Sequence, residues 1–212
     1  MEKKLDFYFV DNGYTDYLQE EEIKNYGDAR VPNMRYPAPR KPKFICGPLF
    51  DGESGFSYYA PVSSYSMQKS ANILIVVPGD RDPIKGSIRF NYMFPVPDEV
   101  LSRYLIFNIE DSSHRFLIKK EFQFLQDYSF NIKSFAKSIY EDIFEQKCTP
   151  RLLINSCRMR FLENRCHQYC KENGLELAEK ERLGYSWKRD KVITIMEEGK
   201  FNAKICSDMG EI

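Results

Sequence analysis

The pattern of the sequence changes near His114, and this change constrains the fold more than any other feature. Before it, short runs rich in β-branched and aromatic residues alternate with turn signals such as Pro78-Gly79-Asp80 and Lys85-Gly86. Such alternation is typical of short strands. The candidate strands are residues 5–10, 43–50, 56–62, 73–77, 87–90 and 101–109. We expect them to form a small, twisted antiparallel β-barrel.

After His114 the apolar residues repeat at helical spacing. Those of residues 132–144 recur every three or four positions, which predicts an amphipathic helix. Thr149-Pro150 is a typical helix start and Asn173-Gly174 a typical stop, so a second helix is expected over residues 150–173. The fold class is therefore α+β, with helices packed against one side of the barrel.

Two parts are expected along the chain. Residues 1–174 form one domain, made of the barrel (1–110) and a helical part (111–174), and residues 175–212 form a C-terminal extension. Within the extension, residues 192–196 and 201–206 flank Glu197-Glu198-Gly199-Lys200 and follow Trp187, a pattern that predicts a β-hairpin.

Composition excludes a globally basic nucleic-acid binder. The 212 residues include 31 basic and 31 acidic side chains, so any RNA contact must depend on local charge. The apolar run after the N-terminus is short and broken by Asp6 and Asp11, so we expect no secretion signal, no membrane span and a cytoplasmic location. In that compartment the six cysteines are expected to be reduced thiols.

Two adjacent hydroxyls, Ser63 and Ser64, stand where an aromatic strand gives way to a polar segment that carries Lys69. Hydroxyls in such a place can face a solvent-accessible, electropositive pocket that suits a phosphate. The alternative is that they are turn residues, which hydrogen-bond their own backbone.

A second feature is a proline-stiffened basic loop before residue 44. Between Asp28 and Lys43 there are five cations, Arg30, Arg35, Arg40, Lys41 and Lys43, with Tyr36 among them. The prolines favour extended backbone. This combination predicts an arm that follows phosphates and stacks one base, as single-stranded RNA requires, although it could equally be a solvated surface loop. Lys69, Lys119 and Lys120 are further candidates for RNA contact.

Other chemistries fit the sequence less well. Ser66-Met67-Gln68-Lys69 matches S-x-x-K, but the S-D-N and K-T-G motifs that accompany it in penicillin-binding enzymes do not occur. Cys148, Cys157, Cys166 and Cys170, with His167, could suggest zinc, but Cys157 and Cys166 would face opposite sides of one helix, and no C-x-x-C pair exists. We therefore expect neither a metal nor another cofactor. His114 and His167 are expected to be structural, not an acid–base pair.

Six short motifs occur in one order along the first half of the chain. They are Phe7-Tyr8-Phe9-Val10, Tyr14-x-x-Tyr17-Leu18, Val31-Pro32, Pro42-Lys43-Phe44-Ile45-Cys46-Gly47, Tyr59-Ala60-Pro61-Val62-Ser63-Ser64 and Asn91-Tyr92-Met93-Phe94-Pro95-Val96-Pro97. In this order and spacing the chain resembles the ToxN/AbiQ family over residues 5–174. The resemblance implies a β-barrel endoribonuclease of the Kid/MazF kind, the toxin of a type III toxin–antitoxin system whose antitoxin is an RNA of tandem repeats.

The resemblance also implies which residues form the catalytic site. The active serine of the family falls on Ser64, the hydroxyl before it on Ser63, its lysine on Lys43 and its tyrosine on Tyr14. Many relatives have a lysine two positions after the active serine; this chain has Ser66 there, and Lys69 could replace it. Tyr14 has an alternative interpretation, because Tyr14-x-x-Tyr17-Leu18 also fits an apolar helix face.

These observations predict a metal-independent endoribonuclease toxin that acts in phage defence by abortive infection. The 2′-hydroxyl of RNA would attack the phosphate and leave a 2′,3′-cyclic phosphate. Cellular and phage RNA would be the substrates, and the antitoxin RNA would hold the toxin in a closed protein–RNA oligomer. One alternative is a barrel that binds RNA without cutting it, and another is a protein-binding scaffold.

Overall fold

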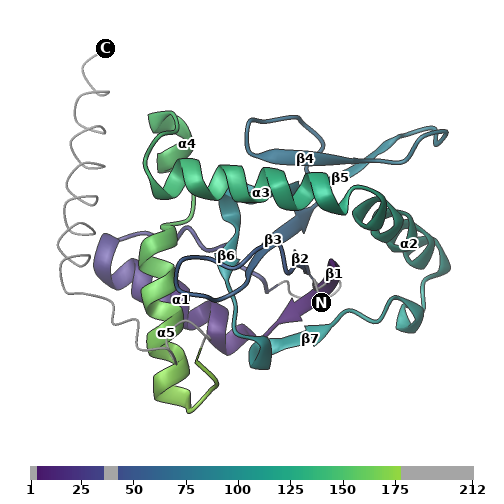
Figure 1. Cartoon of the computed structure of the whole chain (residues 1–212). Helices are drawn as coiled ribbons and strands as arrows, with labels where there is room; N and C mark the ends of the chain where they lie inside the picture. Colours follow the sequence, from purple (N-terminus) through teal and green to yellow (C-terminus); the bar gives the residue numbers. More distant parts are fainter. Residues whose placement is uncertain (1–3, 36–42, 178–212) are drawn as a thin grey trace.

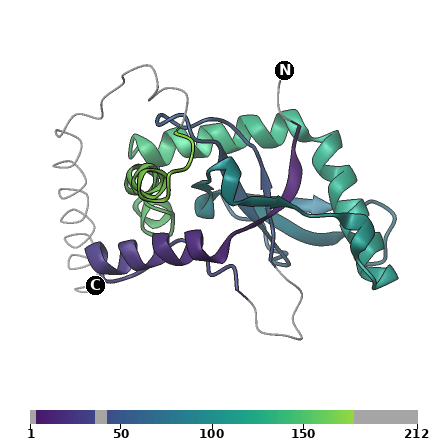
Figure 2. The same cartoon turned by 90° about the horizontal axis from the view of Figure 1, so that it is seen from below.

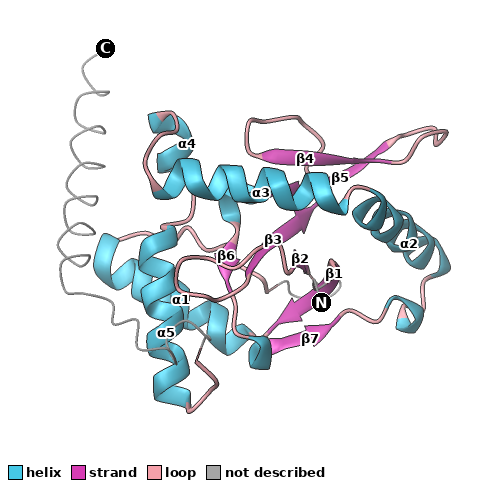
Figure 3. Cartoon of the chain, in the orientation of Figure 1, coloured by secondary structure: helices cyan, strands magenta, loops and turns pink. Residues whose placement is uncertain are grey.

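The structure, a computed structural model, describes residues 4–35 and 43–177, which form an antiparallel sheet with helices packed against it (Figure 1, Figure 3). The strand order is β4 (Asn72–Val76), β5 (Ile84–Arg89), β3 (Tyr58–Ser63), β2 (Ile45–Gly47), β1 (Asp6–Val10) and β7 (Leu101–Arg103). A short strand, β6 (Phe94–Pro95), pairs with the first half of β3. The predicted α+β class is confirmed.

The predicted closed barrel is not confirmed. Within residues 4–35 and 43–177 no pairing joins β4 to β7, so the sheet is open at both of these edges. The predicted strand over residues 101–109 was too long, because a 3-10 turn, η3 (Ile106–Asn108), follows β7. The strand predicted over residues 43–50 is reduced to β2, because Pro48 has no N–H to continue the ladder. The predicted hairpin at 192–206 lies outside the described residues.

Helix α1 (Asn12–Tyr26) follows β1 directly, and the sequence indicated it only as the alternative interpretation of Tyr14. Asp11 caps its start, because the carboxylate accepts hydrogen bonds from the N–H groups of Gly13 (2.7 Å) and Tyr14 (3.2 Å). Gly27 ends it in the left-handed conformation at φ 80°.

The second half is helical, as predicted. Helices α2 (Ser112–Asp127) and α3 (Ser129–Phe144) follow one another, and α3 buries the apolar positions of the predicted 132–144 helix. The single helix predicted over residues 150–173 was wrong, since the chain forms α4 (Pro150–Ile154) and α5 (Met159–Asn173). Between them, Ser156 Oγ donates to the carbonyl of Leu152 (2.6 Å) and the Cys157 N–H to that of Asn91 (2.8 Å), so the chain leaves the helix path.

The core has two parts, one on each face of the sheet (Figure 2). Successive strand residues point to opposite faces, and Cys46 and Ala60 accordingly pack with α2 and α3, whereas Ile45 and Tyr59 pack with α1 and α5. The prediction that helices pack on one side only was therefore incomplete, because α1 and α5 cover the other face. Leu175 and Leu177 still contact the second part of the core, beyond the predicted domain boundary at residue 174.

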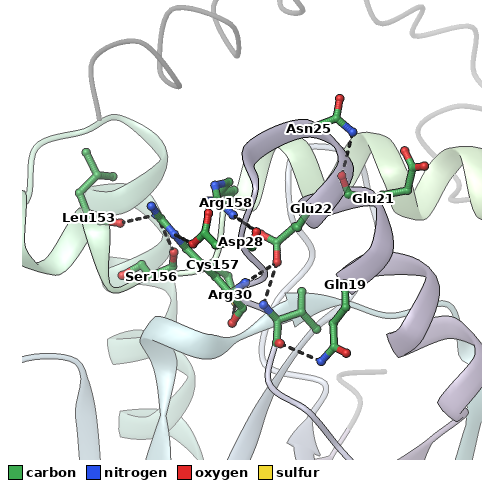
Figure 4. A network of polar contacts seen from close by, with 11 residues as sticks. Gln19, Glu21, Glu22, Asn25, Asp28, Arg30, Leu153, Ser156, Cys157 and Arg158 are labelled. Carbon is green, nitrogen blue, oxygen red and sulfur yellow. Dashed lines mark hydrogen bonds and ion pairs between the residues drawn. The ribbon is translucent and has the colours of Figure 1, made fainter. Parts of the chain in front are cut away.

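A buried carboxylate connects α1 to the turn between α4 and α5 (Figure 4). Glu22 is fully buried and accepts hydrogen bonds from the N–H groups of Arg30 (2.6 Å) and Val31 (2.9 Å). Its other oxygen accepts from Nη1 of Arg158 (3.1 Å), just before α5. The Arg30 guanidinium in turn donates to the carbonyls of Leu153 (3.1 Å) and Ser156 (3.2 Å).

Replacing Glu22 by alanine is expected to lower the free energy of unfolding by about 3–5 kcal/mol, because a buried arginine and two N–H groups lose their acceptor. Urea unfolding measures this change. Glu20→Ala is the matched control: Glu20 is an exposed glutamate on the same helix, and its replacement is expected to cost less than about 0.5 kcal/mol. Equal effects of the two substitutions would contradict a structural role for the buried carboxylate.

Candidate active site

The two predicted hydroxyls lie at the end of β3, a strand with neighbours on both sides. Ser63 is the last residue of β3 and is half-buried, and Ser64 is exposed just after it. The hydroxyl of Ser63 accepts a hydrogen bond from the Tyr65 N–H (3.1 Å), as the turn interpretation expected. The Ser64 hydroxyl makes no hydrogen bond to any described residue, so it can interact with a ligand.

Lys43 lies next to these serines across the sheet. The β2–β3 register pairs Ile45 with Pro61, and the hydrogen bond from the Val62 N–H to the Phe44 carbonyl (3.1 Å) continues it toward Lys43 and Ser63. Alternation along the strands places both of these side chains on one face of the sheet. The ammonium of Lys43 donates to the Asn33 carbonyl, which holds it near this end of the sheet. The register therefore places Lys43 opposite Ser63, and Ser64 follows Ser63 in the chain.

Two further residues of this site were not predicted. The sequence interpreted Gly86 as part of a turn, but it lies within β5, where a Cβ atom would stand 2.4 Å from the carbonyl oxygen of Ser63. Only glycine lets β5 approach β3 this closely, and an isolated glycine inside a strand pattern is the signal for such an approach. Ser87 pairs with Ser63 and is fully buried, and its hydroxyl has no partner among the described residues.

Lys69 is exposed on the loop that follows Ser64, and that loop is fixed by Asn72. The Asn72 side chain is buried, accepts from the Lys69 N–H (2.7 Å) and donates to the Met67 carbonyl (3.0 Å). The backbone at Lys69 is therefore held in place, and Lys69 lines a cavity of about 380 Å³ together with Tyr65, the residue after Ser64.

Tyr14, the fourth predicted catalytic residue, does not join this group. Its side chain is completely buried, and its hydroxyl donates to the Pro95 carbonyl (2.6 Å). Pro95 pairs with Tyr58, six residues before Ser64 along β3, which corresponds to about 20 Å. Burial raises the pKa of the Tyr14 hydroxyl well above its ordinary value, so it stays protonated. This placement favours the alternative interpretation, a residue of the apolar helix face.

The predicted RNA-binding cations lie in different settings. The Arg30 side chain is 13% exposed and is engaged with backbone carbonyls and with Asp28. Arg35 is exposed but pairs with Asp16. Lys119 is exposed on α2, and Lys120 beside it lies 5.1 Å from the ring centroid of Phe116. Tyr36, Arg40 and Lys41 lie outside the described residues.

The cysteines and histidines do not assemble into a metal site within the described residues. The face argument against zinc placed Cys157 on the same helix as Cys166, and this was wrong, because Cys157 precedes α5. Its buried thiol donates to the Arg30 carbonyl (3.4 Å). Burial raises the pKa of both thiols well above the ordinary value, so they are protonated. His114 contacts the Tyr104 hydroxyl (3.3 Å) instead of facing the serines.

The fold places the chain among small α+β proteins that have an open antiparallel sheet with helices on both faces. The family described as toxin ToxN of type III toxin–antitoxin systems matches residues 6–167. The chain therefore belongs to the ToxN toxin family, and the resemblance stated from the sequence is confirmed. None of the helices in the described part of the chain has the length and apolar character needed to cross a membrane.

Relatives and solved structures agree with this assignment. Endoribonuclease ToxN of Pectobacterium atrosepticum is 22% identical over 175 residues, which cover 79% of this chain and 95% of the relative. AbiQ, a lactococcal anti-phage endoribonuclease of a type III system, has the same fold, with a TM-score of 0.65, 20% identity and coverage of 80% and 99%. A type III toxin inhibited by a non-coding RNA pseudoknot has a TM-score of 0.64, 21% identity and coverage of 79% and 98%.

Replacing Ser64 by alanine is expected to lower the rate of RNA cutting by at least about a hundredfold, because one hydrogen-bond donor to the reacting phosphate is removed. Stability is expected to stay within about 0.5 kcal/mol of the parent, since the side chain is exposed. Single-turnover cleavage and urea unfolding measure the two effects. Ser66→Ala, two residues further on, is the matched control and should cut at the parent rate. A fully active Ser64→Ala protein would remove Ser64 from the site.

Replacing Tyr14 by phenylalanine is expected to leave the cutting rate of the folded protein unchanged and to lower the free energy of unfolding by about 1–3 kcal/mol, because the Pro95 carbonyl loses its donor. Tyr17→Phe is the control: the buried Tyr17 hydroxyl has no partner among the described residues, so its loss should be neutral or stabilising. A Tyr14→Phe protein of parent stability with strongly reduced cutting would restore the catalytic assignment.

Proposed function

We propose that the chain is a metal-independent endoribonuclease toxin, inhibited by an RNA of tandem repeats. The observation that carries the proposal is the exposed, unbonded hydroxyl of Ser64 at the strand end that also presents Ser63 and Lys43. Family membership supports it, as do the activities stated for the Pectobacterium toxin and for AbiQ. The role in phage defence and a closed assembly with the antitoxin RNA belong to the same proposal.

The proposed reaction uses the RNA's own 2′-hydroxyl. Its oxygen attacks the adjacent phosphorus, the bond from phosphorus to the 5′-oxygen breaks, and the proton lost by the 2′-hydroxyl is balanced by one gained at the 5′-oxygen. The products are a 2′,3′-cyclic phosphate and a 5′-hydroxyl. No water molecule enters this step, so no metal-bound hydroxide is required.

The site would act by positioning the phosphate and stabilising its charge. The Ser63 hydroxyl already accepts a hydrogen bond from Tyr65, and it keeps its own O–H to donate to a phosphate oxygen. Ser64 would donate a second bond, and the ammonium of Lys43 would neutralise the charge that grows in the transition state. The proposal assigns no role to either histidine, so catalysis would rest on orientation and electrostatics more than on an acid–base pair.

Cutting is expected to continue in excess EDTA and to stop when the nucleotide at the cut position carries 2′-deoxyribose, because the attacking oxygen is then absent. Mass spectrometry of the products checks for the cyclic phosphate. A metal-dependent nuclease in the same buffer is the control for chelation. Activity lost in EDTA and restored by a divalent ion would contradict the mechanism, whereas tight RNA binding without any cutting would favour a non-catalytic RNA-binding module.

A further inference from the structure

A cavity of about 380 Å³ has no assigned role; it is related to the serines through Tyr65, and neither Ser63 nor Ser64 lines it. Tyr65, the residue after Ser64, forms part of its wall together with Lys69, from the loop before β4. Arg89 and Tyr92 contribute from the end of β5 and the following turn, and Arg151 contributes from α4. The wall is thus assembled from segments that lie far apart in the sequence.

Arg89 is the central cation of this cavity. Its side chain lies on the same sheet face as Ser63, because Ser63 pairs with Ser87 and residues two apart on a strand share a face. The guanidinium contacts two aromatic rings, with 5.0 Å to the ring centroid of Tyr65 and 4.4 Å to that of Tyr92. These cation–π contacts hold the guanidinium near both rings, and they use none of its N–H donors for a hydrogen bond to an acceptor.

The charge of the cavity is not balanced. Its described lining includes Lys69, Arg89 and Arg151 and no carboxylate. None of these three cations makes an ion pair with a described residue, and no described group accepts a hydrogen bond from the Arg89 guanidinium. A half-buried guanidinium with five donors and no acceptor is suited to a phosphate, which arginine binds through two parallel hydrogen bonds.

We propose that this cavity binds one nucleotide of the RNA strand next to the cut, with Arg89 on its phosphate and Lys69 and Arg151 as supporting charges. This proposal rests on the proposed function, because the ligand is the same RNA that reaches Ser64. Tyr65 connects the two sites: its N–H donates to the Ser63 hydroxyl, and its ring packs against the Arg89 guanidinium. A phosphate held by Arg89 would therefore set the register of the strand over the serines.

The test measures binding of an RNA that carries 2′-deoxyribose at the cut position, so that it cannot be cut. Arg89→Gln is expected to weaken binding by roughly ten- to a hundredfold, the loss of hydrogen bonds to a charged group. The slope of log affinity against log salt should become shallower by about 0.7, the value for one phosphate of a single strand. Arg89→Lys should restore most of the slope but less of the affinity, because a point charge replaces the planar fork.

Shortening the RNA one nucleotide at a time locates the site. For the parent protein, removal of one particular nucleotide near the cut should lower the affinity. The same removal should not lower the affinity of Arg89→Gln, because the shortened RNA and the substituted protein lack the same contact. Lys24→Gln is the matched control, because Lys24 is an exposed cation on α1. The Lys24→Gln protein should bind the RNA with the affinity and the salt slope of the parent.

The outcomes separate this proposal from the proposed function. If the parent protein binds the RNA but does not cut RNA that has a ribose at the cut position, the endoribonuclease proposal fails. The affinity measurements with the Arg89 variants still test the cavity. If folded Arg89→Gln binds with unchanged affinity and salt slope, the nucleotide site is overturned. If Arg89→Gln does not fold, Arg151→Gln is measured instead, because Arg151 is exposed and lines the same cavity. An unchanged salt slope in Arg151→Gln would also overturn the proposal.

Discussion

One buried carboxylate, that of Glu163 on α5, holds the central strand against helices on both faces of the sheet. It accepts hydrogen bonds from the Tyr58 hydroxyl at the start of β3 (3.0 Å) and from the Tyr140 hydroxyl on α3 (2.7 Å). It also accepts from the Ser54 N–H (2.9 Å) in the loop before β3. Burial raises the pKa of Glu163, and the hydrogen bonds from Tyr140, Tyr58 and Ser54 oppose this rise. A Cβ atom on Gly52 would stand 2.5 Å from this carboxylate, so the loop closes over it only with glycine.

The same strand carries the candidate site at its other end. Tyr58 fixes the beginning of β3 in the core, and pairing with β2 and β5 fixes its path as far as Ser63. Beyond this point the chain leaves the sheet, and Asn72 holds the loop that returns to β4. The exposed Ser64 therefore lies between two fixed segments. In the proposed mechanism this arrangement would provide the preorganisation that catalysis by positioning requires.

The sequence was sufficient to predict those elements that depend on residues close to one another in the chain. The Thr149-Pro150 start, the Asn173-Gly174 stop and the α3 stripe are local, and the structure has them. The strand register places Lys43 opposite Ser63, whereas the catalytic roles that the family resemblance implied remain predictions. Long-range contacts decided the rest. Helix α1 buries Thr15 and the charged Glu22 beside Tyr14 and Leu18, so its apolar face is short and interrupted and is a weak signal for a helix. The break before α5 depends on Asn91, far away in the sequence.

The balance of charge shows why a count of basic residues cannot predict where a polyanion would bind this chain. Several arginines of this neutral chain are held by internal acceptors: Arg158 by Glu22 and Asp28, Arg30 by backbone carbonyls, and Arg35 by Asp16. Such cations stabilise the fold and have little potential left for a ligand. Lys69, Arg89 and Arg151 have no carboxylate partner among the described residues, and they line one cavity together with Tyr65. Affinity for a polyanion therefore depends on which cations the fold leaves without an acid, not on how many the sequence contains.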